Sequence, residues 1–145
     1  MDFYSPNMFV PTPVSEIESF ESETGRRLPG AYKDFISTVG WGRLTVDEKN
    51  VKTSEYTNVF LRPNSIREIL EKRTFDWFVY PDFVEENEIP FFEAANQFVL
   101  VFREGAAPED QVFYPGMPEV YADSFADFLE KLRNDVTFFM KILGQ

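Results

Sequence analysis

The stretch from Leu28 to Gly42 constrains the fold more than any other part of the chain, because it reads as one helix with a stop signal at each end. Pro29 suits the first helical position, where its missing N–H leaves no hydrogen bond unmade. Four apolar side chains then recur at positions i, i+3, i+4 and i+7: Tyr32, Phe35, Ile36 and Val39. Gly40 can adopt the left-handed conformation that ends many helices. The pattern predicts a helix docked on a hydrophobic core, with Trp41 in the corner behind it.

Two further helices are indicated by capping signals. Ser15, with Glu18 three positions later, forms a capping box and predicts a first helix before the stretch above. Ser65 with Glu68 repeats the pattern and predicts a third helix. A last helix opens at Ser124 or the residue before it. Its apolar stripe runs toward the C-terminus: Phe125, Phe128, Leu129, Leu132, Val136, Met140 and Leu143.

Between these helices, β-branched and aromatic residues predict strands. Residues 56–62 have this composition, and another strand begins near Ile89. Residues 98–102 form a continuous apolar run, which is typical of a strand buried on both faces. Residues 111–114 follow a turn and are expected to pair back on that run as the second arm of a hairpin. A short returning strand is expected at residues 120–121.

The length of 145 residues fits one domain, which can bury a core without disulfide bonds. Residues 1–13 contain three prolines and are expected to form an extended N-terminal arm. A single domain then covers residues 14–145. The N-terminus has no signal-peptide pattern, and no apolar run is long enough to cross a bilayer. We therefore expect a cytoplasmic protein that does not bind membranes.

The net charge of −11 is concentrated in one third of the chain. Residues 81–130 contain 12 acidic residues and a single basic residue, Arg103, whereas residues 1–80 contain 12 acidic and 10 basic residues. Such a surface argues against nucleic acid as a direct partner, because phosphate binding needs basic side chains. It suits a basic protein partner attracted over a distance. Acidity that only keeps the protein soluble explains the same charge equally well.

The chain contains no His and no Cys, and most routes to catalysis are therefore missing. It has no imidazole base, no thiolate nucleophile and no zinc site of the usual composition. Neither a P-loop nor a dinucleotide-binding fingerprint occurs. A carboxylate pair or an all-oxygen metal site remains, but the acids between Pro81 and Pro90 do not have EF-hand spacing. We expect a protein that is not an enzyme and needs no metal or cofactor.

The segment from residue 77 to residue 93 combines acids with many aromatic residues and is the candidate partner-binding site. We predict a rim of acids on aromatic anchors, formed by Trp77, Asp82, Glu85, Glu86, Glu88 and Glu93. Tryptophan is frequent at interface hot spots, and charges at a rim speed association. Two alternatives stay open, a solvated acidic face without a partner and a core position for Trp77. The choice between core and interface also stays open for Phe138, Phe139 and Ile142 in the apolar C-terminal tail.

Three blocks of sequence follow one another in a characteristic order. The first is Leu-Pro-x-x-Tyr-x-x-Phe-Ile at residues 28–36. The second is Ile-Pro-Phe-Phe-Glu at residues 89–93, which leads into the apolar run described above. The third is Val-Phe-Tyr at residues 112–114, followed by Asp-Ser-Phe-x-x-Phe-Leu at residues 123–129. From about residue 14 to residue 133, this order resembles the SUKH superfamily, which unites bacterial immunity proteins with a fungal cell-wall regulator.

The resemblance implies a single-domain α+β fold in which helices pack on a mostly antiparallel sheet. It implies no catalysis, and it implies a protein partner, because typical bacterial members are antidotes that bind and block a toxin. Such toxins are often nucleases or deaminases, whose basic clefts an acidic inhibitor can occupy. An intracellular scaffold or regulatory adaptor, as the fungal relative suggests, is the alternative function. The identity of the toxin, the binding face and the oligomeric state do not follow from the sequence.

Overall fold

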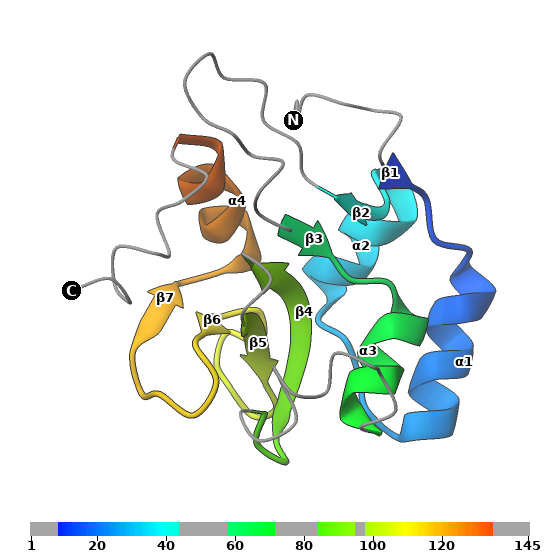
Figure 1. The fold of residues 1–145 in the computed structure, drawn as a ribbon, viewed down its shortest axis with the longest axis horizontal. Helices are drawn as coiled ribbons and strands as arrows, with labels where there is room; N and C mark the ends of the chain where they lie inside the picture. The colour runs from blue at the N-terminus through cyan, green and yellow to red at the C-terminus, as the bar shows by residue number, and fades with distance from the viewer. Residues whose placement is uncertain (1–8, 44–57, 72–83, 95–97, 135–145) are drawn as a thin grey trace.

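The structure is a computed structural model of the chain, and it describes residues 9–43, 58–71, 84–94 and 98–134. These residues form a seven-stranded antiparallel sheet whose strand order follows the chain (Figure 1). The strands are β1 (Phe9–Val10), β2 (Trp41–Arg43), β3 (Asn58–Phe60), β4 (Glu88–Ala94), β5 (Phe98–Arg103), β6 (Val112–Phe113) and β7 (Val120–Ala122). The helices within the described residues are α1 (Val14–Thr24), α2 (Gly30–Thr38), α3 (Pro63–Leu70) and α4 (Phe125–Asn134). The predicted α+β fold with an antiparallel sheet is confirmed.

Helix α2 has the predicted apolar stripe at three of its four positions. Tyr32, Phe35 and Ile36 are buried, whereas Val39 is 38% exposed. The prediction for Val39 was wrong because the helix ends one residue before it, and Val39 is the C-cap beyond the last turn that packs on the core. Pro29 is the N-cap and has an extended backbone, so the helix begins one residue later than predicted.

Gly40 follows the last turn of α2, and its lack of a side chain allows the β1 backbone to pass close to it. Its N–H donates to the carbonyl of Phe35 over 3.0 Å, and its φ is +120°, a region that favours glycine. A Cβ at this position would lie 2.4 Å from the carbonyl carbon of Val10 in β1. Glycine is therefore required both by the backbone angle and by the contact. Trp41 directly behind it starts β2, half-buried, with the Arg62 guanidinium 4.9 Å from the centre of its ring.

Helices α1 and α3 begin before their predicted capping boxes. The N-cap of α1 is Pro13, and the N-cap of α3 is Arg62, followed by Pro63 at the first helical position. Neither helix start has a side-chain capping hydrogen bond, so the predictions that Ser15 and Ser65 cap these helices were wrong. In α3, proline sets the start because the fixed φ of Pro63 suits the first helical position, whereas in α1 the proline is the N-cap itself.

Helix α4 begins where predicted. The backbone N–H of Asp127 donates to Ser124 Oγ over 3.0 Å, which confirms the predicted start. The described part of the apolar stripe is buried as expected: Phe125, Phe128, Leu129 and Leu132. The rest of the stripe lies outside the described residues, and so do Phe138, Phe139 and Ile142.

The predicted strands are present within the ranges that the structure describes. Strand β3 occupies the middle of the 56–62 prediction, and residues 56–57 lie outside the described residues. Strand β5 is buried on both faces from Val99 to Phe102, as its apolar run predicted. Strand β6 pairs with β5, which confirms the predicted hairpin. Strand β1 pairs with β2, so the described part of the predicted arm contributes an edge strand to the sheet.

A bulge in β4 concentrates aromatic rings on one face of the sheet. Pro90 pairs with Val101, and Phe92 pairs with Leu100, so Phe91 is the extra residue between them. The rings of Phe91 and Phe92 consequently both contact Phe128 of α4, with centroid distances of 5.4 and 5.3 Å. Such edge-on ring contacts add to the energy of simple burial.

Tyr32 occupies the centre of this aromatic core. Its ring lies 5.4 Å from Phe91, 5.5 Å from Phe102 and 5.3 Å from Phe125, measured between centroids. Its hydroxyl donates to the carbonyl oxygens of Leu61 and Phe91, over 2.7 and 3.1 Å. Burial raises the pKa of the Tyr32 phenol well above its ordinary value. The side chain therefore joins α2 to the β3–α3 junction and to β4.

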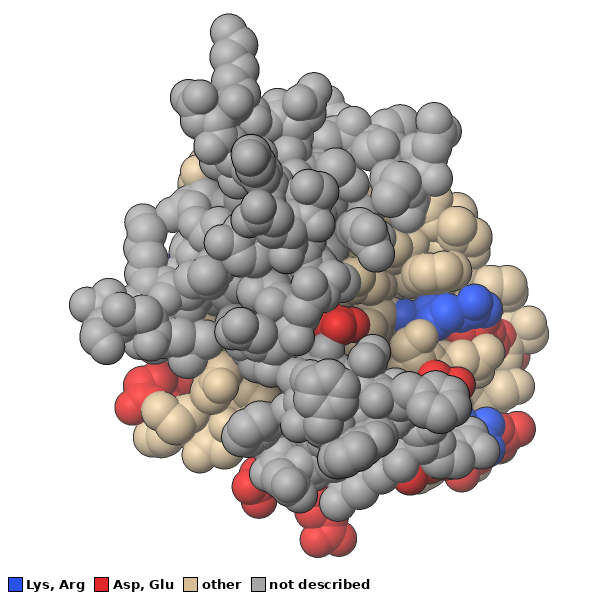
Figure 2. Space-filling model, viewed as in Figure 1, with Lys and Arg blue, Asp and Glu red and all other residues tan. Residues whose placement is uncertain are grey.

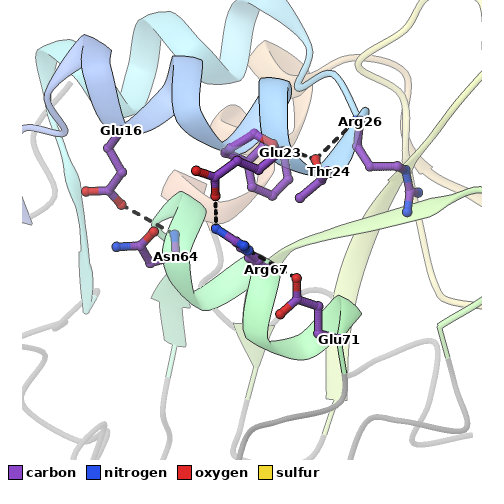
Figure 3. Close-up of polar contacts among 8 residues, drawn as sticks. Glu16, Glu23, Thr24, Arg26, Asn64, Arg67 and Glu71 are labelled. Atoms are coloured by element: carbon purple, nitrogen blue, oxygen red, sulfur yellow. Dashed lines mark hydrogen bonds and ion pairs between the residues drawn. The ribbon is translucent and has the colours of Figure 1, made fainter.

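Helices α1 and α3 lie side by side at one flank of the sheet, and α4 lies at the opposite flank (Figure 1). The contact between α1 and α3 includes polar side chains, which are drawn in Figure 3. Arg67 of α3 forms ion pairs with Glu23 of α1 and with Glu71. Glu16 of α1 accepts two hydrogen bonds from Arg62, of 2.7 and 3.0 Å.

Candidate functional site

The predicted binding residues divide between described and undescribed parts of the chain. Trp77 and Asp82 lie outside the described residues. Glu85 and Glu86 are exposed in the turn that precedes β4. Figure 2 shows acidic side chains along the lower edge of the molecule, which in Figure 1 is the end of the sheet where β4 begins.

Glu93 lies near the opposite end of β4. It pairs with Val59 of β3 and Val99 of β5 and is half-buried. It stands five positions after Glu88, a distance of roughly 15 Å along an extended strand. The structure therefore does not bring Glu93 together with the acids of the turn before β4.

Glu88 is 1% exposed and is paired inside the molecule. Its Oε2 accepts hydrogen bonds from Arg103 Nε over 2.9 Å and from the Gly116 N–H over 3.0 Å, and its Oε1 accepts one from the Glu85 N–H over 2.9 Å. We expected Glu88 to lie on an exposed rim of acids, and this expectation was wrong because its side chain is buried. The cause is the strand register, which sets Glu88 directly opposite Arg103 of β5.

Arg103 is the only basic residue between positions 81 and 130, and the fold uses it internally. Besides its ion pair with Glu88, its Nη2 donates to the carbonyl oxygens of Tyr114 and Met117. Its guanidinium also lies 4.1 Å from the centre of the Phe113 ring. Because this positive charge is balanced by Glu88, the neighbouring exposed acids are left with no basic residue from the same third of the chain.

A groove of about 500 Å³ opens beside the Glu88–Arg103 pair. One wall is the turn before β4, and the other is the loop between β6 and β7. The lining residues are Glu85, Asn87, Glu88, Arg103, Gly116, Met117 and Pro118. Met117 is 42% exposed, which places a flexible apolar side chain at the mouth of a polar groove.

Two acids that were not predicted belong to the same end of the sheet. The backbone N–H of Glu104 donates to the carbonyl of Asn87 over 2.9 Å, so Glu104 lies next to the turn before β4. Glu119 is exposed on the loop that carries Met117. The predicted pairing of β4 with β5 could have indicated the position of Glu104. In an antiparallel hairpin the end of the second strand lies beside the start of the first, so the residue after β5 returns to the turn before β4. We call the four exposed acids Glu85, Glu86, Glu104 and Glu119 the acidic end.

A family model described as the SMI1 / KNR4 family (SUKH-1) matches residues 11–131. The chain belongs to this family. The matched range runs from the start of α1 into α4 and includes the whole groove, so the superfamily resemblance is confirmed. No curated protein and no solved structure matches the chain.

SUKH-1 membership sets the function at the level of the family. Its members are immunity-protein-like proteins and related regulators, generally non-catalytic, that work by contact with another protein. Within the described residues, no helix of this SUKH-1 chain is long and apolar enough to cross a membrane.

The groove of the SUKH-1 domain does not offer the carboxylate pair that a hydrolase would need. Glu85 and Glu88 both line it, but both carboxylate oxygens of Glu88 already accept hydrogen bonds from N–H groups. General acid–base catalysis needs a carboxyl group that can reach the substrate, whereas Glu88 is buried and its oxygens are engaged inside the fold. Among the described residues, no group of three or more Asp and Glu side chains could hold a metal ion.

A second cavity of about 290 Å³ lies between the α1–α2 link and the end of β5. Arg27, Glu104 and Glu109 line it together with the buried rings and aliphatic groups of the sheet. Glu109 accepts a hydrogen bond from the Gly30 N–H at the start of α2, over 3.1 Å, and Glu104 pairs with Arg26 over 2.8 Å. The mixture of charges gives this cavity no clear preference for a cation or an anion.

Proposed function

We propose that this SUKH-1 protein is a cytoplasmic immunity protein that binds a toxin through its acidic end and neutralises it. The observation that supports the proposal is the internal use of Arg103. That guanidinium is paired to Glu88, and Arg26 is paired to Glu104. Among the described residues no ion pair compensates Glu85, Glu86 or Glu119, and these exposed acids attract a basic surface.

The proposed partner is a toxin that acts on nucleic acid. Enzymes that bind phosphates need basic clefts, and the acidic end is complementary to such a cleft. The proposed contact surface also includes Trp77 and Asp82 from the acidic and aromatic segment of the sequence, whereas Glu93, near the opposite end of β4, is left out of it. Glu88 supports this surface from inside by holding the Glu85 and Gly116 backbones.

Charge reversal at the acidic end tests the proposal. The partner is the toxin domain encoded beside the gene, or the protein recovered by pull-down from the native host and identified by mass spectrometry. The double variant Glu85→Lys/Glu86→Lys should associate with it about tenfold more slowly at low salt and should show a flatter dependence of the association rate on salt.

The matched control is Glu18→Lys/Glu130→Lys, which changes the net charge equally at two exposed positions on α1 and α4. Stopped-flow association of the two double variants separates local from total charge. Equal association rates and salt slopes for all three proteins would place the binding site elsewhere. A gene without a neighbouring toxin, together with no protection of cells that express the toxin domain, would favour the regulatory adaptor.

A further inference from the structure

The groove beside Glu88 has two walls that are tied to one ion pair, formed by the buried Glu88 and the half-buried Arg103. Glu88 accepts hydrogen bonds from the Glu85 N–H in one wall and from the Gly116 N–H in the other. Arg103 donates to the carbonyl of Met117 in the second wall. Because both walls are anchored to the same pair, the width of the groove is set before any partner arrives. Preorganisation of this kind lowers the entropy cost of binding.

The groove presents a carboxylate and an apolar contact on opposite walls. The Glu85 carboxylate lies close to Gly116, since a Cβ there would be 3.8 Å from Glu85 Oε2. Met117 and Pro118 continue the same wall with exposed apolar surface. Arg103, the only cation among the described lining residues, is already bound to Glu88. A side chain that enters this groove therefore meets apolar surface along its length and negative charge at its end.

We propose that this groove receives one lysine or arginine side chain of a protein partner, with its aliphatic stem against Met117 and its charged group at Glu85. The inference rests on the proposed function, and it names the contact that the acidic end would make. Lys and Arg both combine an apolar stem with a charged head. Charge complementarity favours this occupant over the alternatives. The neighbouring exposed acids Glu86 and Glu119 would repel an acidic side chain, and a purely apolar side chain would leave these acids without a positive charge nearby.

Methyl NMR tests the proposal directly, because the chain contains only 4 Met residues. The probe is the capped tripeptide acetyl-Gly-Arg-Gly-amide, and its matched control contains citrulline, which has the same shape without the charge. Titration to roughly millimolar concentrations should shift the Met117 methyl signal with the arginine peptide alone. Glu85→Gln should weaken binding about two- to fivefold, as expected for an exposed ion pair, whereas Glu130→Gln on α4 should leave it unchanged.

A second variant separates the two walls. Met117→Ala should weaken binding of the arginine peptide, followed at the Gly116 amide signal, because the stem loses its apolar contact. Equal responses to the arginine and citrulline peptides, or unchanged binding in Glu85→Gln, would overturn the proposal.

Addition of the toxin domain distinguishes the inference from the function on which it rests. If the toxin binds and the Met117 signal does not move, the groove is not the contact and the proposed function stands. If the Met117 signal responds to the arginine peptide in a Glu85-dependent way while no toxin binds, the groove is a cation site and the proposed function fails.

Discussion

Tyr32 and Tyr121 show how differently two buried phenols can contribute to one domain. The Tyr32 hydroxyl donates to two carbonyls, whereas the Tyr121 hydroxyl is buried without a hydrogen-bond partner among the described residues. Burial raises the pKa of Tyr121 to about 12. A buried polar group costs free energy unless it is paired, so the two hydroxyls should have opposite effects on stability.

We expect Tyr32→Phe to lower the free energy of unfolding by about 1–2 kcal/mol, because it leaves the carbonyls of Leu61 and Phe91 without this donor. Urea denaturation at neutral pH measures the change. The matched control, Tyr121→Phe, should leave stability unchanged or slightly higher, since it removes an unpaired hydroxyl. Equal losses in the two variants would show that ring packing, not hydrogen bonding, decides the effect.

At the scale of elements, α1 and α3 lie in contact and are joined by ion pairs, of which the Arg67–Glu23 pair is drawn in Figure 3. The Glu16–Arg62 pair joins the start of α1 to the N-cap of α3. The hydrogen bond from Arg62 is the largest cause that holds the pKa of Glu16 below its ordinary 4.5, and the Asn64 N–H adds to it against the effect of burial. The contribution of this ion pair to the contact between α1 and α3 therefore depends on pH.

The lowered pKa of Glu16 predicts the sign of a pH effect. A carboxylate whose pKa is depressed by folding stabilises the native state fully above the unfolded pKa, and this stabilisation is lost as the pH falls through the folded pKa. Glu16→Gln should cost about 0.5–1 kcal/mol at pH 7, allowing for solvent screening, and less at about pH 3.

Urea denaturation of both proteins at the two pH values measures this difference. Glu130→Gln on α4 is the control, because Glu130 is an exposed acid on a different helix from the α1–α3 contact. A difference between wild type and Glu16→Gln that does not change with pH would contradict the assigned role of the pair.

For the whole molecule, the uneven charge has an effect on stability as well as on binding. Most of the net charge of −11 comes from residues 81–130, and the fold places several of those acids at one end of the sheet. Exposed like charges repel one another, and dissolved ions screen that repulsion within about 10 Å at 0.1 M salt. The native state should therefore respond to ionic strength.

We expect the free energy of unfolding at pH 7 to rise as NaCl increases from about 10 to about 150 mM. Glu85→Gln/Glu86→Gln should show a smaller rise, and it should be a few tenths of a kcal/mol more stable than wild type at the low salt concentration. Chemical denaturation across the salt series measures both effects. A fall in stability with salt would mean that the attractive ion pairs outweigh the repulsion at the acidic end.

Local patterns in the sequence were sufficient for the elements that form the core. The burial of Tyr32, the doubly buried strand β5 and the Ser124 cap of α4 were all predicted, because each depends on neighbours a few positions away along the chain. The starts of α1 and α3 were missed because proline and serine are both helix-start residues and local sequence does not rank them.

The groove at the acidic end depends on tertiary structure instead. Glu88 was expected among exposed acids, but the register of β4 and β5 pairs it with a half-buried Arg103 and buries the Glu88 carboxylate. The same register brings Glu104 to the turn before β4, while the length of the strand carries Glu93 away from it. Sequence alone determined which segments form the four described helices and strands β3 to β7, together with the excess of acid, whereas strands β1 and β2 were not predicted. The exposure of each charge was decided only by strand pairing, because electrostatic contacts join residues that are distant in the chain.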